Sequence, residues 1–220
     1  MSSKEEKKVE DEEYEAPLTD PKEILKHRIS LDLMKTRLTE YFLKNNIYSY
    51  HIVEAPSDYY HKTLEERRVI LNTHTKDIIC KSIILENTAY DESIKNEFYQ
   101  KYYLTVVQYT NEFNAEKIAK NLKNFINDKF NLKLANKHFH FRLAKNEVAF
   151  EMTGFTFNAI GPFLMKCKDM KILFPKNLYE IYPQYFFVGG GEYELKVGMC
   201  VDDFMKLLGK NTIVLDSATY

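Results

Sequence analysis

The stretches DIICKSIILE at residues 77–86 and YYLTVVQY at residues 102–109 both have the composition of β-strands that are apolar on both faces. Such strands are typical of the middle of a sheet that is covered on each side. Residues 114–130 then place their apolar side chains on one stripe at helical spacing. Strands and helices are therefore expected to alternate along the chain instead of falling into separate blocks.

Further elements with recognisable ends surround these strands. A helical region is expected at 19–46, because Asp20 before a proline suits a first turn and apolar residues then recur at helical spacing, in one long helix or two short ones. Residues 63–71, TLEERRVIL, predict a short helix in which Thr63 and Glu66 form a capping box. The other expected elements are strands at 48–53, 171–174, 186–188 and 193–197 and helices at 145–153 and 201–208.

Composition predicts one cytoplasmic domain with a charged tail. The 220 residues are 45% hydrophobic, which suffices for one sizeable core, and residues 1–18 have the composition of a disordered segment. Residues 1–20 carry three Lys against eight Asp and Glu, whereas the other 200 carry 28 Lys and Arg against 24 Asp and Glu. This mildly basic body tolerates a polyanionic partner. Neither a signal peptide nor a membrane span is evident, so no membrane partner is expected.

Several classes of site are disfavoured by motifs that the sequence lacks. Three widely separated cysteines suggest neither a disulfide framework nor a zinc ribbon. His138 and His140 lie on one side of an extended segment, but no third metal ligand stands at suggestive spacing. The absence of a G-x-G-x-x-G or Walker-type loop disfavours kinases and dinucleotide enzymes. The sequence therefore predicts neither a metal nor a cofactor.

The glycines are concentrated in one part of the chain. Six of the seven lie between residues 154 and 198, so close backbone approach is expected to matter most there. Three of them, Gly189, Gly190 and Gly191, are consecutive between two strand-like runs. A hairpin turn with a bulge and a ligand-facing loop explain this run about equally well, and the two are compatible.

Lys81 is anomalous within its predicted strand. The two-residue period places it on one face with Ile79, Ile83 and Leu85. Lysine is rarely buried without a partner, since an unpaired ammonium costs several kcal/mol or loses its proton. Two interpretations remain open: Lys81 reaches the sheet edge or a core carboxylate, or it lines a pocket.

Four segments in order carry a resemblance: YFLKNNIYSYHIVEAPS at 41–57, IICKSIILEN at 78–87, TGFTFNAIGPF at 153–163 and FFVGGGEYELKVGMCVDDFMKLLG at 186–209. Together they resemble the YbaK and prolyl-tRNA synthetase-associated editing domains over about residues 31–215. The elements YYHKTLEERRVIL, CKSI and VVQYT are more similar to a eukaryotic branch than to the bacterial stand-alone proteins. The resemblance implies an α+β fold, a mixed β-sheet flanked by helices, with an N-terminal helical extension.

The resemblance also implies an activity, which is hydrolysis of the ester that joins a mischarged amino acid to the terminal adenosine of tRNA. The family's strand lysine falls on Lys81, and its glycine turn falls on residues 189–191. Its G-x-x-x-P loop falls on Asn158, Ala159, Ile160, Gly161 and Pro162. Asn158 replaces the first glycine of that loop. Because asparagine tolerates positive φ, the loop could keep its shape while the side chain reaches toward the pocket.

The chemistry requires few residues. The ester is already activated, so hydrolysis needs a positioned water and stabilisation of the developing oxyanion more than a strong nucleophile. We expect Lys81 to anchor the terminal phosphate or adenosine, backbone N–H groups of 158–162 to orient the aminoacyl carbonyl, and a ribose hydroxyl of the substrate to direct water. Tyr60 is a candidate for stacking on a base or for closing the core. Candidates for tRNA phosphate contacts or for solvated surface are Arg67, Arg68 and Arg142.

Two functions from different classes are consistent with these features. The first is an aminoacyl-tRNA deacylase for Ala- or Cys-tRNA(Pro), acting in trans or with prolyl-tRNA synthetase, whose partner is the aminoacylated 3′ end of tRNA. The second is a catalytically inactive tRNA-binding or scaffold module of a synthetase complex. Asn158 in place of glycine is the feature that keeps the second function open.

Overall fold

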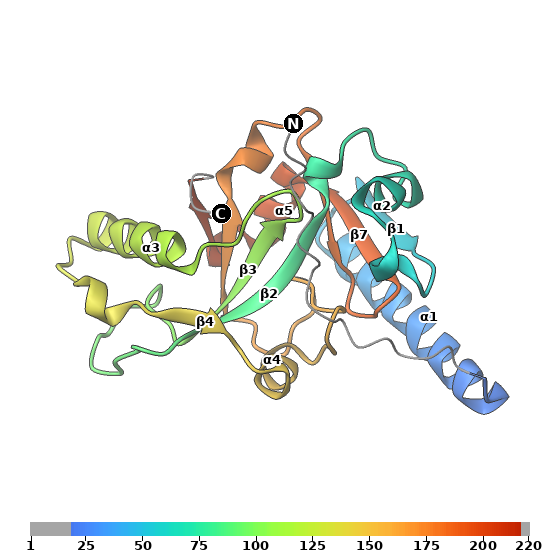
Figure 1. Ribbon diagram of the computed structural model, residues 1–220, viewed down its shortest axis with the longest axis horizontal. Coiled ribbons are helices and arrows are strands. Elements are labelled where there is room, and N and C mark those ends of the chain that lie inside the picture. The colour runs from blue at the N-terminus through green and yellow to red at the C-terminus, as the bar shows by residue number, and fades with distance from the viewer. Residues whose placement is uncertain (1–18, 217–220) are drawn as a thin grey trace, which may run out of the picture.

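The computed structural model describes residues 19–216, which form two β-sheets with helices around them (Figure 1). The larger sheet is mixed, because β2 is antiparallel to β3 and β4 whereas β3, β5 and β8 are parallel. Its strands, in spatial order, are β4 (Phe141–Leu143), β2 (Cys80–Asn87), β3 (Tyr102–Gln108), β5 (Lys171–Pro175) and β8 (Thr212–Leu215). The smaller sheet is antiparallel, in the order β1 (Tyr50–Glu54), β7 (Leu195–Cys200) and β6 (Tyr185–Gly189).

The α-helices of the described residues are α1 (Pro21–Lys44), α2 (Leu64–Ile70), α3 (Ala115–Phe130), α4 (Asn146–Thr153) and α5 (Val201–Leu208). The capping box of α2 is confirmed, because the Thr63 side chain accepts from the Glu66 N–H while the Glu66 carboxylate accepts from the Thr63 N–H. Within residues 19–216, none of the helices combines the length and the apolar character needed to cross a bilayer.

The central strands have a core on each face, as their apolar composition predicts. On one face of β3, Tyr103 and Val107 pack with the buried stripe of α3. On the other face, Leu104 and Val106 belong to the larger core, which extends to the smaller sheet and to α1. Figure 1 shows α3 at one end of the molecule and α1 at the other, with β2 and β3 between them.

The N-terminal helical region is one continuous helix. Asp20 is its N-cap and accepts from the Lys22 N–H, with proline in the first turn. From Leu31 onward, α1 buries Leu31, Met34, Leu38 and Phe42 against the rest of the domain. Its first turns extend away from the sheets (Figure 1), and Leu25, Ile29 and Leu33 are exposed along the helix. The predicted disorder of residues 1–18 lies outside the described residues.

The structure differs from the sequence prediction in the number and grouping of strands. β4 and β8 were not expected, because each is only three or four residues long and neither shows a clear alternation. Both β1 and β7 begin two residues later than expected. The strands also divide between two sheets, which a periodicity along the chain cannot reveal.

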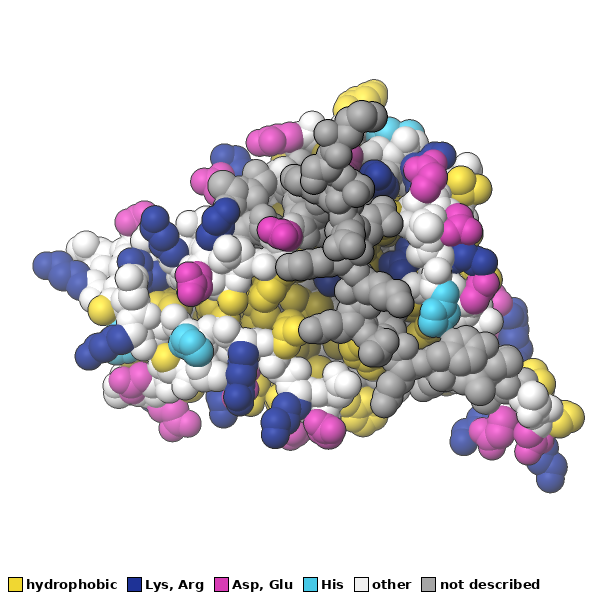
Figure 2. Space-filling model, viewed as in Figure 1, with side chains coloured by type: hydrophobic (Ala, Val, Ile, Leu, Met, Phe, Trp, Pro, Cys, Tyr) yellow, Lys and Arg dark blue, Asp and Glu magenta, His cyan; other side chains and the backbone are white. Residues whose placement is uncertain are grey.

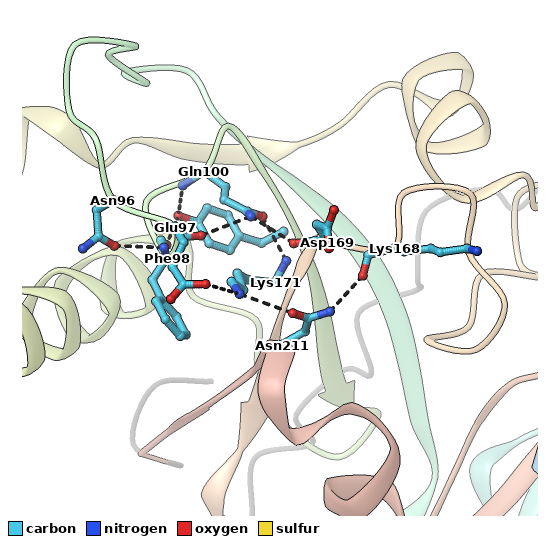
Figure 3. A network of polar contacts seen from close by, with 9 residues as sticks. Asn96, Glu97, Phe98, Gln100, Lys168, Asp169, Lys171 and Asn211 are labelled. Atoms are coloured by element: carbon cyan, nitrogen blue, oxygen red, sulfur yellow. Dashed lines mark hydrogen bonds and ion pairs between the residues drawn. The ribbon is translucent and has the colours of Figure 1, made fainter. Parts of the chain in front are cut away.

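A polar network fixes the start of the parallel strands (Figure 3). The Lys171 ammonium is buried and lies 3.4 Å from a Glu97 carboxylate oxygen and 3.3 Å from the Asn211 side-chain oxygen. Gln100 accepts from the Lys171 backbone N–H at 2.9 Å and donates to the Asp169 carbonyl at 3.0 Å. These bonds tie the loop before β3 to the beginnings of β5 and β8.

The glycine-rich region brings two backbones into direct contact. A Cβ added to Gly161 would lie 1.9 Å from the Gly189 carbonyl oxygen, and one added to Gly189 would lie 2.2 Å from the Ile160 carbonyl oxygen. The Gly191 N–H donates to the Ala159 carbonyl at 3.0 Å. The loop before β5 is therefore held against the β6–β7 hairpin through main chain, as the concentration of glycines predicts.

Replacing Gly161 by alanine should destabilise the domain strongly, because the added methyl meets rigid backbone on both sides of the contact. We expect Gly161→Ala to lower the free energy of unfolding by about 3 kcal/mol, measured by urea denaturation. Gly209→Ala is the matched control, since its added Cβ lies no closer than 3.8 Å to another residue. Equal unfolding free energies for the two variants would contradict this role of Gly161.

Candidate functional site

A cavity of about 490 Å³ lies where the two sheets separate. Among the described strands, β4 pairs with β2 through Leu85, Glu86 and Asn87, and Ile79 forms an isolated bridge with Phe187 of β6. The part of the β2 edge between these pairings faces the cavity, so side chains from both faces of the strand reach its wall. Other wall residues come from the turn before α2, the start of α4, residues 157–160 and the ends of β6 and β7.

Lys81 lies in this wall and is exposed. Its ammonium is 5.5 Å from the centre of the Tyr109 ring, a distance at which a ring face attracts a cation. Of the two interpretations of this lysine, the geometry matches a cation beside an open pocket.

Asn158 lies in the same wall with φ of 63°, the left-handed conformation that its loop position was expected to need. The Tyr60 hydroxyl donates to its carbonyl, and both Tyr60 and Ile160 also line the cavity. The Ala159 N–H donates to the Thr156 carbonyl at 3.1 Å, so it is already used within the turn. Proline has no N–H. Gly161 lies outside the wall, so the expected carbonyl-orienting role is left to residues 158 and 160.

Lys196 is a wall residue that the sequence analysis missed. It lies in β7, the central strand of the smaller sheet, and is 5% exposed. Its ammonium donates to the Tyr193 carbonyl at 2.6 Å, with the Tyr59 and Tyr60 ring centres each 4.8 Å away. Burial lowers the pKa of Lys196 to about 7, the Glu194 charge opposes that shift, and Arg67 adds to it. A lysine within the apolar run LKVGM was a signal of the same kind as Lys81.

The polar groups of the cavity have one sign of charge. Among residues 19–216, its wall contains Lys81 and Lys196 but neither an aspartate nor a glutamate. The Ser82 hydroxyl is buried in the wall and has no partner among the described residues. The thiol of Cys80 is also buried, and desolvation raises its pKa, which disfavours a thiolate at neutral pH. The cavity is therefore suited to anionic or neutral ligands.

Arg67 is an interior residue, which corrects its expected role as a surface contact for tRNA phosphates. It is 7% exposed, and its guanidinium donates to the carbonyls of Tyr59, Tyr60 and Lys62. The same group lies 5.0–5.4 Å from the rings of Tyr59, Tyr60 and Tyr109. Arg67 therefore fixes the tyrosines that surround Lys196. Arg68 and Arg142 lie nearer the surface and pair with Glu65 and Glu86 respectively.

Several residues predicted to bind substrate lie behind the cavity wall. Gly161 packs on Gly189, and the Gly190 N–H donates to the Leu195 carbonyl at 2.9 Å to close the hairpin. Gly191 has φ of 91° in the same turn. The structure thus brings together Lys81, Tyr60, Asn158, Ile160 and Gly189 in the wall, whereas Ala159, Gly161, Pro162, Gly190 and Gly191 lie outside it. The glycine run is both a hairpin turn and, through Gly189, part of the wall.

The molecular surface does not concentrate positive charge on the face seen in Figure 2. Lysine and arginine side chains alternate there with aspartate and glutamate, while hydrophobic side chains run through the middle. Recognition of a polyanion on this face would therefore depend on local groups more than on a broad positive field.

The pKa of Lys196 makes stability depend on pH in a defined direction. Between the folded pKa of about 7 and the unfolded value of 10.5, the unfolded chain binds more protons, so the Lys196 contribution to the free energy of unfolding rises with pH. We expect wild type to gain about 2 kcal/mol between pH 7 and pH 9 relative to Lys196→Met, measured by urea denaturation at each pH. Parallel pH curves for the two proteins would contradict the shifted pKa.

Comparison with known proteins reveals similarity in fold. No family model matches the sequence, and no curated protein is similar to it. A crystal structure of a candidate trans-editing enzyme for prolyl tRNA synthetase has a TM-score of 0.60 and 16% identity, covering 83% of this chain and 96% of that one.

Two other solved structures show the same similarity. A scaffold protein used for computational epitope backbone grafting has a TM-score of 0.60 and 15% identity, covering 83% of this chain and 95% of that one. A protein described as hypothetical has a TM-score of 0.56 and 14% identity, covering 81% of this chain and 97% of that one. The chain therefore has the α+β fold of the YbaK-like editing domains.

Proposed function

We propose that this protein is an aminoacyl-tRNA deacylase that hydrolyses the ester of a mischarged tRNA. The observation that carries the proposal is the convergence of Lys81, Asn158 and Gly189 on one cavity, although 77 residues separate the first two along the chain. The fold shared with a candidate trans-editing enzyme supports it. The amino acid is proposed to be alanine or cysteine on the proline tRNA, and the protein to act in the cytoplasm, in trans or with prolyl-tRNA synthetase.

Each group of the wall has a role in this proposal. The Lys81 ammonium, exposed beside Tyr109, binds the phosphate or adenosine of the terminal nucleotide. Backbone N–H groups at 158 and 160 orient the aminoacyl carbonyl and stabilise the oxyanion that forms when water attacks it. A ribose hydroxyl of the substrate directs that water. A small uncharged side chain fits a wall that carries two lysines and no carboxylate.

Lys196 adds a buried amine to the same wall, and its pKa of about 7 lets it hold a proton when negative charge develops beside it. Tyr193 occupies one of its N–H groups, and the Tyr59 and Tyr60 rings lie beside it. A cation in a dry wall acts on negative charge more strongly than a solvated one, because water does not screen it. Lys196 is therefore proposed to favour the anionic transition state from within the cavity.

A second candidate function is a tRNA-binding module without catalysis. Asn158 favours it, because an amide side chain stands in the wall where the family's loop has glycine. In this case the cavity would still hold the end of the tRNA, but the carbonyl would not reach the loop N–H groups.

Removing the Lys81 charge should abolish most of the hydrolysis. We expect Lys81→Ala to lower kcat/KM for Ala-tRNA(Pro) and Cys-tRNA(Pro) by about 100-fold, measured by release of the labelled amino acid. Lys101→Ala is the matched control, since that exposed lysine also lies over a tyrosine ring, Tyr102 at 5.4 Å, but outside the cavity. Wild-type rates in Lys81→Ala would refute the assigned role.

Comparing the wild type with Asn158→Gly distinguishes the two candidate functions. For a deacylase, the wild type is active and the glycine variant changes the ranking of mischarged tRNAs, because a wall side chain is lost. For a binding module, the wild type binds tRNA without hydrolysis. Filter binding and deacylation of the same tRNA preparations distinguish these results.

A further inference from the structure

Two large apolar side chains stand at the mouth of the cavity. Phe157 and Leu143 both line it, yet they are 54% and 58% exposed. A residue that is part of the wall and more than half open to solvent lies at the rim. A single exposed apolar side chain is common on proteins, but two of them at the mouth of one cavity form a surface that a ligand can cover.

The local backbone holds Phe157 outward. Phe155, two residues earlier, is buried in the larger core, and Asn158, the next residue, is fixed in the left-handed conformation with its carbonyl bound by Tyr60. The ring is thus attached to a loop whose position is set on both sides. A preorganised aromatic surface loses little entropy when a flat ligand stacks on it.

The charges beside this rim indicate what kind of ligand fits. Lys81 and Lys196 line the same cavity, which has no carboxylate in its wall, so an anion is favoured there. An aromatic face next to a cationic pocket is the arrangement that binds single-stranded nucleic acid, with the base on the ring and the phosphate on the cation. A hydrophobic protein segment could pack on the ring but would leave the two lysines without an anionic partner from the ligand.

We propose that Phe157, with Leu143 on the rim of the same cavity, is a stacking platform for an unpaired base at the 3′ end of an RNA whose last nucleotide enters the cavity. The proposal rests on the proposed function, because it takes the esterified nucleotide as the occupant of the cavity. The platform is a positioning site: it binds the strand and does not touch the reacting ester.

The sequence permits a direct optical test, because the chain contains no tryptophan. Phe157→Trp therefore introduces a single indole at the rim. We expect the RNA trinucleotide CCA, without an amino acid, to quench its fluorescence, whereas inorganic tripolyphosphate should leave it unchanged. The control is Leu25→Trp, at an exposed position in the first half of α1, where neither compound should have an effect. Equal quenching by tripolyphosphate, or none by CCA, would overturn the platform.

Kinetics provide a second measurement. Phe157→Ala should raise KM for aminoacyl-tRNA about 5- to 150-fold with kcat nearly unchanged, and Phe157→Trp should restore the wild-type KM. A fall in kcat with KM unchanged would refute a positioning role. If the wild type hydrolyses no aminoacyl-tRNA but CCA quenches the indole, the platform stands and the proposed deacylase falls. If the wild type is active and Phe157→Ala keeps its KM, the platform alone falls.

Discussion

The site depends on one steric constraint, the contact of main chain with main chain between Gly161 and Gly189. With 1.9 Å between an added Cβ and the opposite carbonyl, neither position has room for a side chain. The contact fixes the loop that carries Asn158 and Ile160 relative to the hairpin that carries Lys196. It also sets the distance across the cavity, because β2 stays in place through its pairing with β3. A wall assembled from several separate segments is thereby held by backbone, and its side chains are left available for a ligand.

The sequence directs attention to this region for a physical reason. Glycine in ordered backbone and lysine in an apolar interior both lower folding stability. A cluster of glycines, or a lysine inside an apolar strand, therefore indicates that the structure or the function requires it there. Lys196 satisfied the same criterion as Lys81 and could have been found by it. Arg67 could not, because its burial depends on carbonyls that η1 (Tyr59–His61) presents only once folded. The short strands β4 and β8 were equally invisible, since their pairing is decided by partners far along the chain.

Buried cations recur in the interior, and each is accommodated in the same way. Lys171, Lys196 and Arg67 are at most 7% exposed, and each combines oxygen acceptors with at least one aromatic ring. Lys171 has a carboxylate within 3.4 Å, whereas Lys196 has two backbone carbonyls and two rings. Lys171 is therefore a cation that stabilises the fold, whereas the charge of Lys196 remains partly uncompensated beside a cavity. The second kind costs stability, and such a cost is typical of functional sites.

The open part of the β2 edge has a consequence for how the protein behaves before it is fully folded. An unpaired strand edge can add a strand from another molecule, and a charged residue on the edge is a common protection against such aggregation. Lys81 lies on this edge, and residues 157–160 and the start of α4 line the same cavity in the native state. Before these segments have assembled around the edge, a charge at Lys81 disfavours pairing with a strand of another molecule. The same side chain would then serve solubility during folding and ligand recognition afterwards.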